Sequence, residues 1–428
     1  MQPGRSSRRS FLGGLAVSVG AWTSTSWMPA LAAVGTGNRQ KAKSVILIWL
    51  NGGPSTIDLW DLKPGHDNGG PFKEIATTVP GMRISEHLPN LAAVAHEFSL
   101  IRSMATREGD HARARVASIT GYTPQGAIKF PAIGSLVAHE FDVTNDIPSY
   151  VHVGGQPAVT GGGFLGPQFA PFVVGGGTRR PQAADEGAAS LKVDNLESRS
   201  AAAKDLRLAL LEELSARSGL PASPVAESVV SARIQALRLM NPKAASAFSL
   251  DDEPEAIRDS YGMTTFGQGC LLARRLVERG VSFVEVSLDG WDTHGNNFEQ
   301  VKTLSHQLDQ GVATLFKELR ERGLLSETLV VCQGEFGRTP RINGQAGRDH
   351  WPSTWAVMLG GAGIRGGQVV GRTSADGAHL ESEPTRTADL MATIFQGIGL
   401  DPRKQNMSNV GRPIRLADPD GTAIEELV

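Results

Sequence analysis

The clearest pattern in the chain is a succession of apolar runs and Gly-flanked loops between residues 281 and 359. Apolar, β-branched runs at 281–288, 328–332 and 355–359 predict three buried strands. Between the first two, apolar residues recur at helical spacing from Leu304 to Leu319 and stop before Gly323, which predicts a helix. Strand, loop, helix, strand, loop and strand is the order of a parallel α/β sheet. We therefore predict an α/β fold with a mostly parallel central sheet and helices on both faces.

The same reading extends to the rest of the chain. It predicts strands at 44–50, 98–102 and 150–153, a helix at 89–97 and a last helix that begins near Thr387. Helical spacing at 206–214 and 229–239 predicts a helical insertion at about 185–280. The glycine triplets at 161–163 and 175–177 are read as loops, because neither has the spacing of a phosphate-binding loop.

Residues 1–33 have the features of an export signal. A twin-arginine motif, Ser7-Arg8-Arg9-Ser10-Phe11-Leu12, precedes a moderately apolar stretch and the small residues Ala30-Leu31-Ala32. The alternative is an ordinary amphipathic N-terminal helix. No later run approaches the ~20 apolar residues of a membrane span. We expect the twin-arginine machinery to export a mature domain, 34–428, to the periplasm or the extracellular space.

Composition and charge narrow the possible partners. The 428 residues suffice for a large core, and the 50 glycines suggest many tight loops. The formal net charge of −2 becomes −5 without residues 1–33, which hold three arginines and no acid. Nucleic acid is therefore not an expected partner. Cys270 and Cys332 are expected to be buried free thiols; a disulfide between them is the alternative.

Four potential metal ligands follow the predicted strands of the 281–359 region. Asp292 and His294 come after the first strand, Glu335 after the second, and His350 before the third. Sites in α/β proteins form at the carboxyl ends of such strands, so we expect these side chains to converge. Carboxylate and imidazole suit Zn²⁺, Mn²⁺, Ca²⁺ or Mg²⁺. Each residue alone also has a structural explanation, as a cap, a loop histidine or an ion-pair partner.

Other polar residues near strand ends complete the candidate site. Asp110, His111 and Arg115 follow the strand at 98–102, although such a charged cluster is often only a solvated face. Arg338 and Arg348 have the paired donors that bind an anion. Asn51 and Ser55 flank a Gly-Gly-Pro turn after the first strand, where a plain turn is an equal alternative.

These motifs together resemble the secreted family called domain of unknown function 1501. The motifs are Asn51-Gly-Gly-Pro-Ser55, Gly109-Asp-His111, Gly290-Trp-Asp-Thr-His294, Gly334-Glu-Phe-Gly-Arg-Thr-Pro340 and Gly347-Arg-Asp-His-Trp-Pro352. That family is similar to the alkaline phosphatase and sulfatase superfamily of metal-dependent phospho- and sulfohydrolases. The resemblance implies an alkaline phosphatase-like fold, a divalent metal ion and an anionic small molecule or glycan ester as the substrate.

The resemblance also implies roles for individual residues, with clear departures. Asp292, His294 and His350 match metal ligands, whereas Asn51 replaces a metal-binding Asp and Phe336 replaces a His. The position of the usual hydroxyl or thiol nucleophile falls on or near His111. The implied catalytic residues are His111, Asp110 and Arg338; the implied metal ligands are Asp292, His294, Glu335 and His350; the implied substrate contacts are Asn51, Ser55, Arg115, Arg348 and Asp349.

Two functions are therefore considered. The first is an exported hydrolase of phosphate or sulfate esters with an atypical nucleophile. The second is a non-catalytic secreted binding protein that keeps the fold and recognises an anionic glycan or a protein. The position of His111 distinguishes them, because a His111 far from Asp292 and His350 would leave the hydrolase without its attacking group.

Overall fold

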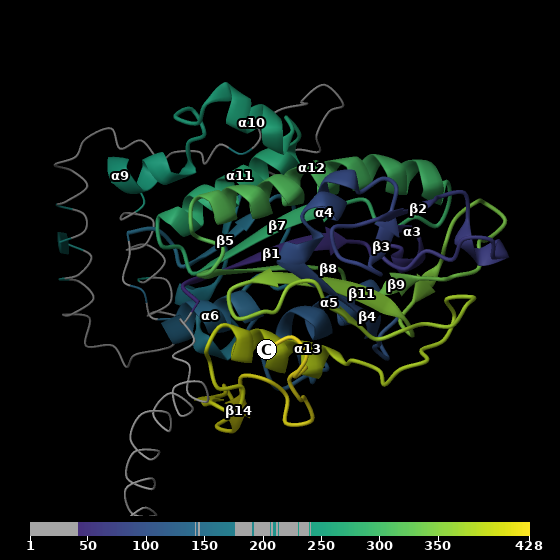
Figure 1. Cartoon of the computed structure of the whole chain (residues 1–428). Helices are drawn as coiled ribbons and strands as arrows, with labels where there is room; N and C mark the ends of the chain where they lie inside the picture. The colour runs from purple at the N-terminus through teal and green to yellow at the C-terminus, as the bar shows by residue number, and fades with distance from the viewer. Residues whose placement is uncertain are drawn as a thin grey trace, which may run out of the picture. The chain divides into compact units, whose positions relative to one another are not determined.

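A large, mostly parallel β-sheet forms the centre of the molecule in the computed structural model (Figure 1). The model describes residues 42–428, apart from 142, 144–145 and most of 176–240, where only 191, 206, 209–210, 213, 230 and 239 are described. Eight strands of the described residues form the sheet, in the order β12-β4-β11-β8-β1-β7-β5-β6. They are β1 (Ser44–Asn51), β4 (Phe98–Met104), β5 (Tyr150–Val153), β6 (Phe172–Val174), β7 (Phe283–Asp289), β8 (Thr328–Gln333), β11 (Trp355–Gly361) and β12 (Val369–Val370).

One strand of this sheet runs against the others. β1 pairs in parallel with β7 and β8, and β5 pairs in parallel with β6 and β7, whereas β11 is antiparallel to both β8 and β4. The predicted mostly parallel sheet is thus confirmed, but the strand predicted at 355–359 has the opposite direction. Its beginning therefore lies beside the carboxyl ends of β8 and β4, with Trp355 opposite Met104.

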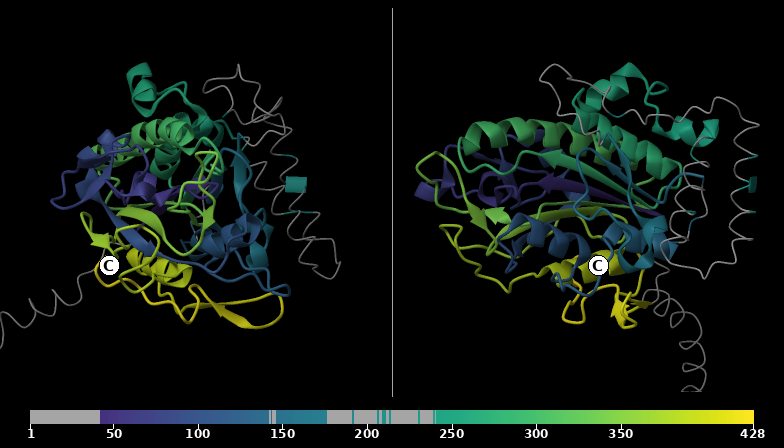
Figure 2. Two further views of the ribbon diagram at one scale, coloured as in Figure 1. Left: turned by 90° about the vertical axis from the view of Figure 1, so that its right-hand side faces the viewer. Right: turned by 180° about the vertical axis from the view of Figure 1, so that it is seen from behind.

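Helices cover both faces of the sheet (Figures 1 and 2). The two longest, α11 (Thr265–Glu278) and α12 (Asn297–Glu321), lie on one face, and α5 (His111–Thr120), α6 (Ile133–Phe141) and α13 (Thr387–Gly397) lie on the other. Shorter helices are α3 (Thr56–Leu59), α4 (Pro89–Ala93), α9 (Pro242–Ala245) and α10 (Glu255–Tyr261), with 3-10 turns at Asp67–Gly69, Ala95–Glu97, Gly163–Leu165, Pro167–Phe169 and Ser246–Phe248. Three small ribbons pair β2 (Glu74–Ala76) with β3 (Arg83–Ser85), β9 (Gly337–Arg338) with β10 (His350–Trp351), and β13 (Gln405–Met407) with β14 (Pro413–Arg415).

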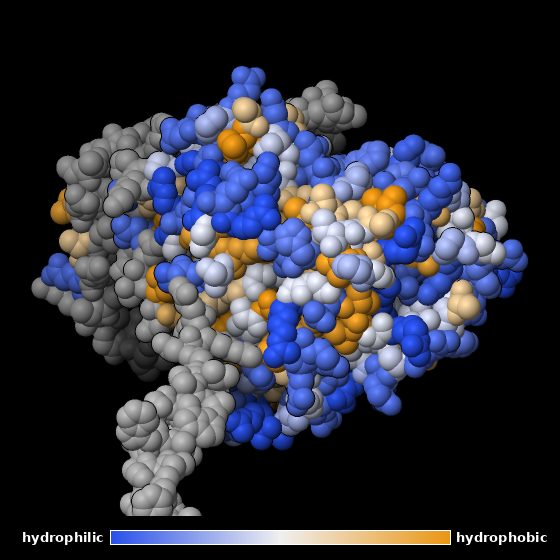
Figure 3. Space-filling model, in the orientation of Figure 1, coloured by the Kyte–Doolittle hydropathy of each residue, from blue (hydrophilic) through white to orange (hydrophobic). Residues whose placement is uncertain are grey.

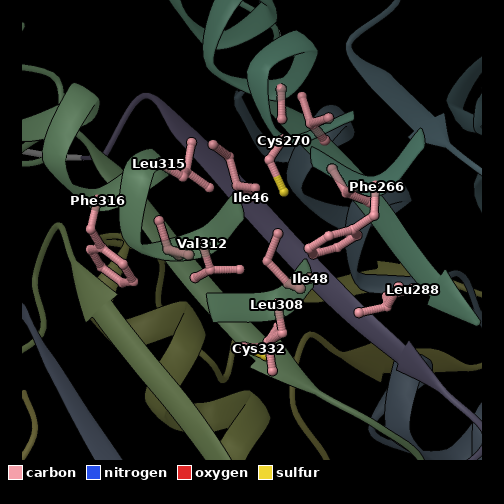
Figure 4. Close-up of a cluster of buried hydrophobic side chains, with 14 of the residues drawn as sticks. Ile46, Ile48, Phe266, Cys270, Leu288, Leu308, Val312, Leu315, Phe316 and Cys332 are labelled. Carbon is pink, nitrogen blue, oxygen red and sulfur yellow. The ribbon is translucent and has the colours of Figure 1, made fainter. Parts of the chain in front are cut away.

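The sequence of β1 shows why the sheet has two apolar faces. Alternate residues of a strand point to opposite faces, and both sets are apolar here. Ile46, Ile48 and Leu50 join the cluster beneath α11 and α12, and the intervening residues join the cluster beneath α6 and α13. Figure 4 shows the first cluster, in which side chains of the strands meet those of the helices above them.

Both cysteines belong to this first cluster. Cys270 projects from α11 and Cys332 from β8 (Figure 4), and both are buried and free. Burial raises the pKa of both thiols. The expectation of two buried free thiols is confirmed.

The predicted helical insertion is described only in part. The helical spacings at 206–214 and 229–239 lie almost wholly outside the described residues, as does the export signal at 1–33. At its described end, α11 packs against β7 and α12 and so belongs to the helical layer of the core. The described helices include none that is long and apolar enough to cross a membrane. The face in Figure 3 is largely hydrophilic, with small separate hydrophobic patches.

Candidate functional site

The candidate site lies at one edge of the sheet, where β1, β4, β7 and β8 end and β11 begins. Residues 292 and 294 follow β7, Glu335 follows β8, and His111 opens α5 after β4. His350 precedes β11, and the β9–β10 ribbon pairs it with Arg338. Because β11 is antiparallel, its beginning brings His350 to the edge where its parallel neighbours end.

Three histidines surround one carboxylate oxygen at this edge. Asp292 Oδ1 lies 3.1 Å from His294 Nε2, 3.4 Å from His111 Nε2 and 3.5 Å from His350 Nε2. The Nε2 atoms of His294 and His350 are 3.1 Å apart. We call these four residues the histidine cluster. The structure thus brings His111 beside Asp292 and His350, as the hydrolase hypothesis requires.

The other ring nitrogen of each histidine is held by an acceptor. His111 Nδ1 lies 2.7 Å from Glu335 Oε1, His294 Nδ1 lies 2.7 Å from Asp349 Oδ1, and His350 Nδ1 lies 2.8 Å from the Gly109 carbonyl oxygen. Such acceptors favour the proton on Nδ1 of a neutral imidazole, which leaves Nε2 as the acceptor atom. At His294, Nε2 also lies 3.5 Å from Arg338 Nη1. His111 Nε2 is buried and has no hydrogen-bond partner in the described part of the chain. The Nε2 atoms of all three histidines therefore lie close to Asp292 Oδ1, and those of His111 and His350 belong with it to one group of mutually close ligand atoms.

The spacing of the cluster fits a single metal ion. Zn²⁺ binds imidazole nitrogen at about 2.0–2.1 Å in tetrahedral geometry, which separates two ligand atoms by about 3.4 Å. The separations of 3.1–3.5 Å given above match this value. The ligand atoms of His111, Asp292 and His350 also all lie within 4.8 Å of one another. Three nitrogens and one oxygen suit Zn²⁺ better than Ca²⁺ or Mg²⁺, which prefer oxygen ligands.

Glu335 supports the cluster through His111. It is fully buried, its carboxylate accepts the Gly52 N–H at 3.1 Å and 3.3 Å, and Arg115 Nε lies 3.4 Å from Oε1. Its contact with the cluster is the His111 Nδ1 bond. The sequence predicted Glu335 as a metal ligand and His111 as a catalytic group, whereas their placement makes His111 the ligand candidate and Glu335 its partner.

The turn after β1 fixes this arrangement because it approaches the 291–292 backbone very closely. Gly52 has φ +119°, and a Cβ there would lie 2.5 Å from the Asp292 nitrogen. Only glycine suits that conformation and that distance. The Asn51-Gly-Gly-Pro-Ser55 turn thus serves the site through its backbone.

Charges around the cluster shift several pKa values. The hydrogen bond with Glu335 raises the pKa of His111, and burial lowers the pKa of His350. Burial opposes ionisation of Asp292, but the hydrogen bond and the charge of Arg338 outweigh it and lower the pKa of that carboxyl. The lowered pKa values favour an ionised Asp292 and a neutral His350, the states that metal binding needs, whereas the raised pKa of His111 favours its protonated form, whose Nε2 proton a metal would have to displace.

Arg338 has no group free for an anionic substrate. Its side chain is fully buried, and it donates to the carbonyl oxygens of Gly52, Gly53 and Arg348 and to Asp292 Oδ1. These bonds hold the turn after β1 and the cluster carboxylate together. The guanidinium is placed to position Asp292, which differs from the predicted catalytic role.

Arg348 and Ser55 lie in a buried polar network rather than at the cluster. Arg348 donates to both oxygens of Asp58 at 2.8 Å, and Ser55 Oγ donates to Asp58 Oδ2 at 2.6 Å. Arg348, Ser55 and Asp58 are all fully buried. The substrate contacts predicted for Arg348 and Ser55 are therefore not supported by their positions, because water and ligands do not reach these side chains.

The remaining predicted residues have varied positions. The side chain of Asn51 contacts Trp49 and Asp289, neither of which belongs to the cluster. Asp349 orients His294 as described above. Asp110 caps α5 by accepting the Arg113 N–H at 3.1 Å, which makes His111 the first residue of the helix. Arg115, one turn along α5 from His111, keeps a third of its side chain exposed beside Glu335.

Two supporting residues were not predicted. Asn343 donates to the His294 carbonyl oxygen at 2.9 Å and to Asp349 Oδ1 at 3.4 Å, and Asn297 donates to Asp58 Oδ2 at 2.8 Å. Both join the loop after β7 to other site loops. The sequence carried one indication, since the loops at 291–297 and 343–350 are polar and contain one and two glycines, respectively.

Comparisons with known proteins extend over almost the whole described chain. The family model described as "Protein of unknown function (DUF1501)" matches residues 42–428. No curated protein sequence matches the chain.

Solved structures that resemble it include Ps i-CgsB in complex with k-i-k-neocarrahexaose, at 13% identity over 85% of this chain and 73% of that chain, with a TM-score of 0.43. PsFucS1 sulfatase from Pseudoalteromonas sp. is 13% identical over 85% of this chain and 69% of its own, with a TM-score of 0.39. Phosphonate monoester hydrolase SpPMH from Silicibacter pomeroyi is 13% identical over 89% and 75%, with a TM-score of 0.37.

Proposed function

We propose that this chain, which belongs to the family described as "Protein of unknown function (DUF1501)" as its motifs predicted, is a metal-dependent hydrolase of phosphate or sulfate esters. The description of the family names no activity, so the proposal is argued from the residues of the site. The observation that carries the proposal is the convergence of three Nε2 atoms on Asp292 Oδ1, each ring being held through its Nδ1.

The ligands in this proposal are His111, His294, His350 and Asp292. When bound there, a divalent ion such as Zn²⁺ would polarise a phosphoryl or sulfuryl oxygen and lower the pKa of a bound water. Glu335, Asp349 and the Gly109 carbonyl hold the three rings in the ligand orientation. The Arg338 guanidinium offsets the charge of Asp292 and orients its carboxylate by a hydrogen bond to Oδ1.

The anionic group of the ester would lie at the beginning of α5. The N-terminus of a helix favours an anion, and Arg115 adds a partly exposed guanidinium in the next turn. Asp110, exposed at the cap of the same helix, remains a candidate for proton transfer to the leaving group. Ser55 is buried against Asp58, so we propose that water rather than this hydroxyl attacks the ester.

We also propose that the mature domain acts outside the cytoplasm after twin-arginine export. This rests on the Ser7–Leu12 motif, the moderately apolar stretch that follows it and the Ala30–Ala32 cleavage motif.

The first test is the metal content of the mature protein purified without chelator. We expect a stoichiometric divalent ion in the wild type and almost none in a His294→Ala, His350→Ala double variant. His379→Ala, an exposed histidine away from the cluster, is the control and should keep the ion. A wild type without metal would overturn the proposal.

Activity is measured on the same samples with aryl phosphate, phosphonate and sulfate esters. The proposal requires hydrolysis of at least one class that depends on the metal and is lost in the double variant. Bound metal without hydrolysis of any ester would favour the secreted binding protein with a structural ion.

A further inference from the structure

A groove lies beside α5, apart from the histidine cluster. Its volume is 710 Å³, which is within the ~300–1,000 Å³ range of small-ligand sites. It is lined by α5 and by two loops, with Arg113, Val116, residues 124–130 without Ala127, residues 158–163 and Pro167. We call it the α5 groove. Neither the sequence motifs nor the proposed chemistry assigns it a role.

The groove and the cluster lie on different faces of α5. Residues three or four positions apart share a face of a helix. His111, Arg115 and Ser118 share the face that contacts Glu335, whereas Arg113 and Val116 line the groove. A helix with its side chains is about 10–12 Å wide. A ligand that occupied both sites would have to extend around the beginning of α5.

The charge of the groove favours an anion. Its described lining includes two cations, Arg113 and Lys129, and no acidic residue, although the whole chain has a net charge of −2. Lys129 is exposed and its ammonium forms no ion pair with the described residues. Arg113 is held in place by Glu108 through two bonds of 2.7 Å, from Nε and Nη2, and this ion pair offsets its charge, so that Lys129 supplies most of the positive charge of the lining.

The glycine triplet adds backbone donors to the same lining. Gly162 has φ −78° and ψ 12°, and Gly163 has φ 58°. Right-handed followed by left-handed residues form a concave nest of N–H groups that binds anions. Of its three donors here, the Phe164 N–H is already bonded to the Lys129 carbonyl oxygen at 2.8 Å. In the described part of the chain, the N–H groups of Gly161, Gly162 and Gly163 donate to no acceptor. These donors are an observation independent of the two cations.

Both walls of the groove are anchored, so its shape is fixed. Phe164 donates to the Lys129 carbonyl oxygen at 2.8 Å, which ties the two loops together. On the outer side, Asn409 accepts the Lys129 N–H at 3.1 Å and donates to the Ala127 carbonyl oxygen at 3.0 Å.

The apolar part of the lining favours a sugar over an alkyl chain. Val116, Ile128 and Val159 are partly exposed rather than buried, and they alternate with glycine and polar residues. A sugar ring places C–H surfaces on such side chains and keeps its hydroxyls in water. An alkyl chain would remain largely wet there and would gain little.

We propose that the α5 groove binds an anionic oligosaccharide, with a sulfate or phosphate group of the chain at the glycine triplet and Lys129. As an extension of the proposed function, the same oligosaccharide presents its reacting ester at the histidine cluster. The oligosaccharide can bind in the α5 groove whether or not its ester is hydrolysed.

The test is calorimetric titration of the mature protein with sulfated dextran oligomers. We expect binding that weakens with added salt, and none by unsulfated oligomers of the same length. Lys129→Ala removes a cation from the exposed lining, and Gln125→Glu adds an acid to it. Each substitution should weaken binding about tenfold. Lys317→Ala and Gln396→Glu, exposed positions on α12 and α13, are the matched controls and should leave it unchanged.

Three results would overturn the proposal. These are no binding of the sulfated oligomer, equal binding by the groove variants and the wild type, or preferential binding of a short alkyl sulfate at the same site. A further titration of the His350→Ala variant separates the two proposals. If that variant still binds the oligomer and the groove variants do not, the groove proposal is supported even where no ester is hydrolysed. If only His350→Ala loses binding, the anion binds at the cluster and the groove proposal fails.

Discussion

The roles of single residues at this site depend on which atoms they face. Sequence motifs placed His111, Glu335 and Arg338 at one edge of the sheet, and the structure brings all three together. Glu335, predicted as a metal ligand, is buried and contacts the cluster through His111, and Arg338, predicted as a catalytic residue, is buried against Asp292. A histidine whose Nδ1–H donates a hydrogen bond to a carboxylate becomes a better metal ligand at Nε2. The side-chain partners, rather than the residue types, therefore decide which group meets the ion.

Arg338→Lys tests the positioning role of this guanidinium. Lysine cannot reproduce a planar fork that meets three carbonyl oxygens and Asp292, so we expect a loss of about 2–4 kcal/mol in the free energy of unfolding. Denaturant titration measures it. Arg372→Lys, in an exposed pair with Glu381, should change stability by less than about 0.5 kcal/mol. An unchanged stability with a weaker affinity for anions would instead make Arg338 a substrate-binding residue.

Among the elements, α6 is joined to the β13–β14 hairpin through one carboxylate, Glu140. It accepts hydrogen bonds from Lys404, from Asn406 at 3.0 Å and from its neighbour His139 at 3.1 Å. Burial opposes ionisation of Glu140, but these hydrogen bonds outweigh it and lower the pKa from its usual 4.5. Because the folded pKa lies below the unfolded one, this contribution is present above about pH 4.5 and is lost as the pH falls through the folded pKa.

Glu140→Gln tests this connection. We expect a loss of about 1–2 kcal/mol in stability at pH 7, which becomes smaller at pH 3, below the unfolded pKa of 4.5. Denaturant titrations of both proteins at the two pH values measure the difference. Glu381→Gln is the exposed control and should show almost no effect at either pH. An equal loss at pH 7 and pH 3 would mean that the carboxylate charge is not what joins the two elements.

The sequence predicted the long apolar strands correctly. It could not predict the direction of a strand in the sheet or the contacts between residues far apart in the chain. The runs of β1 and β8 are apolar on both faces, so their burial could be inferred, and so could the parallel sheet. The direction of β11 could not be inferred, since an apolar run has the same pattern in a parallel and in an antiparallel strand. β6 and β12, with three and two residues, are too short to give a pattern. The contact of Arg348 with Asp58 could not be predicted, because the two residues lie 290 positions apart in the sequence.

At the scale of the whole molecule, the histidine cluster joins segments that are far apart in the chain. His111 follows β4, Asp292 and His294 follow β7, and His350 precedes β11, so the ligands are assembled only in the folded state. The loops that carry them are also locked to each other, since Arg348 N–H donates to the Thr293 carbonyl oxygen at 3.0 Å and Asn297 N–H to that of Ala346 at 2.9 Å. An ion at the cluster would therefore act as a crosslink of the native fold.

Such a crosslink predicts that metal raises the stability of the whole domain. A ligand that binds only the native state stabilises it by about 2.7 kcal/mol at a concentration of 100 times its Kd. We expect chelator to lower the Tm of the wild type by about 3 °C or more, and Zn²⁺ to restore it. Scanning calorimetry on wild type, His350→Ala and the control His379→Ala measures this. The control should respond as the wild type does, and His350→Ala should hardly respond. An equal response in His350→Ala would place the stabilising ion elsewhere and remove the physical basis of the proposed hydrolase.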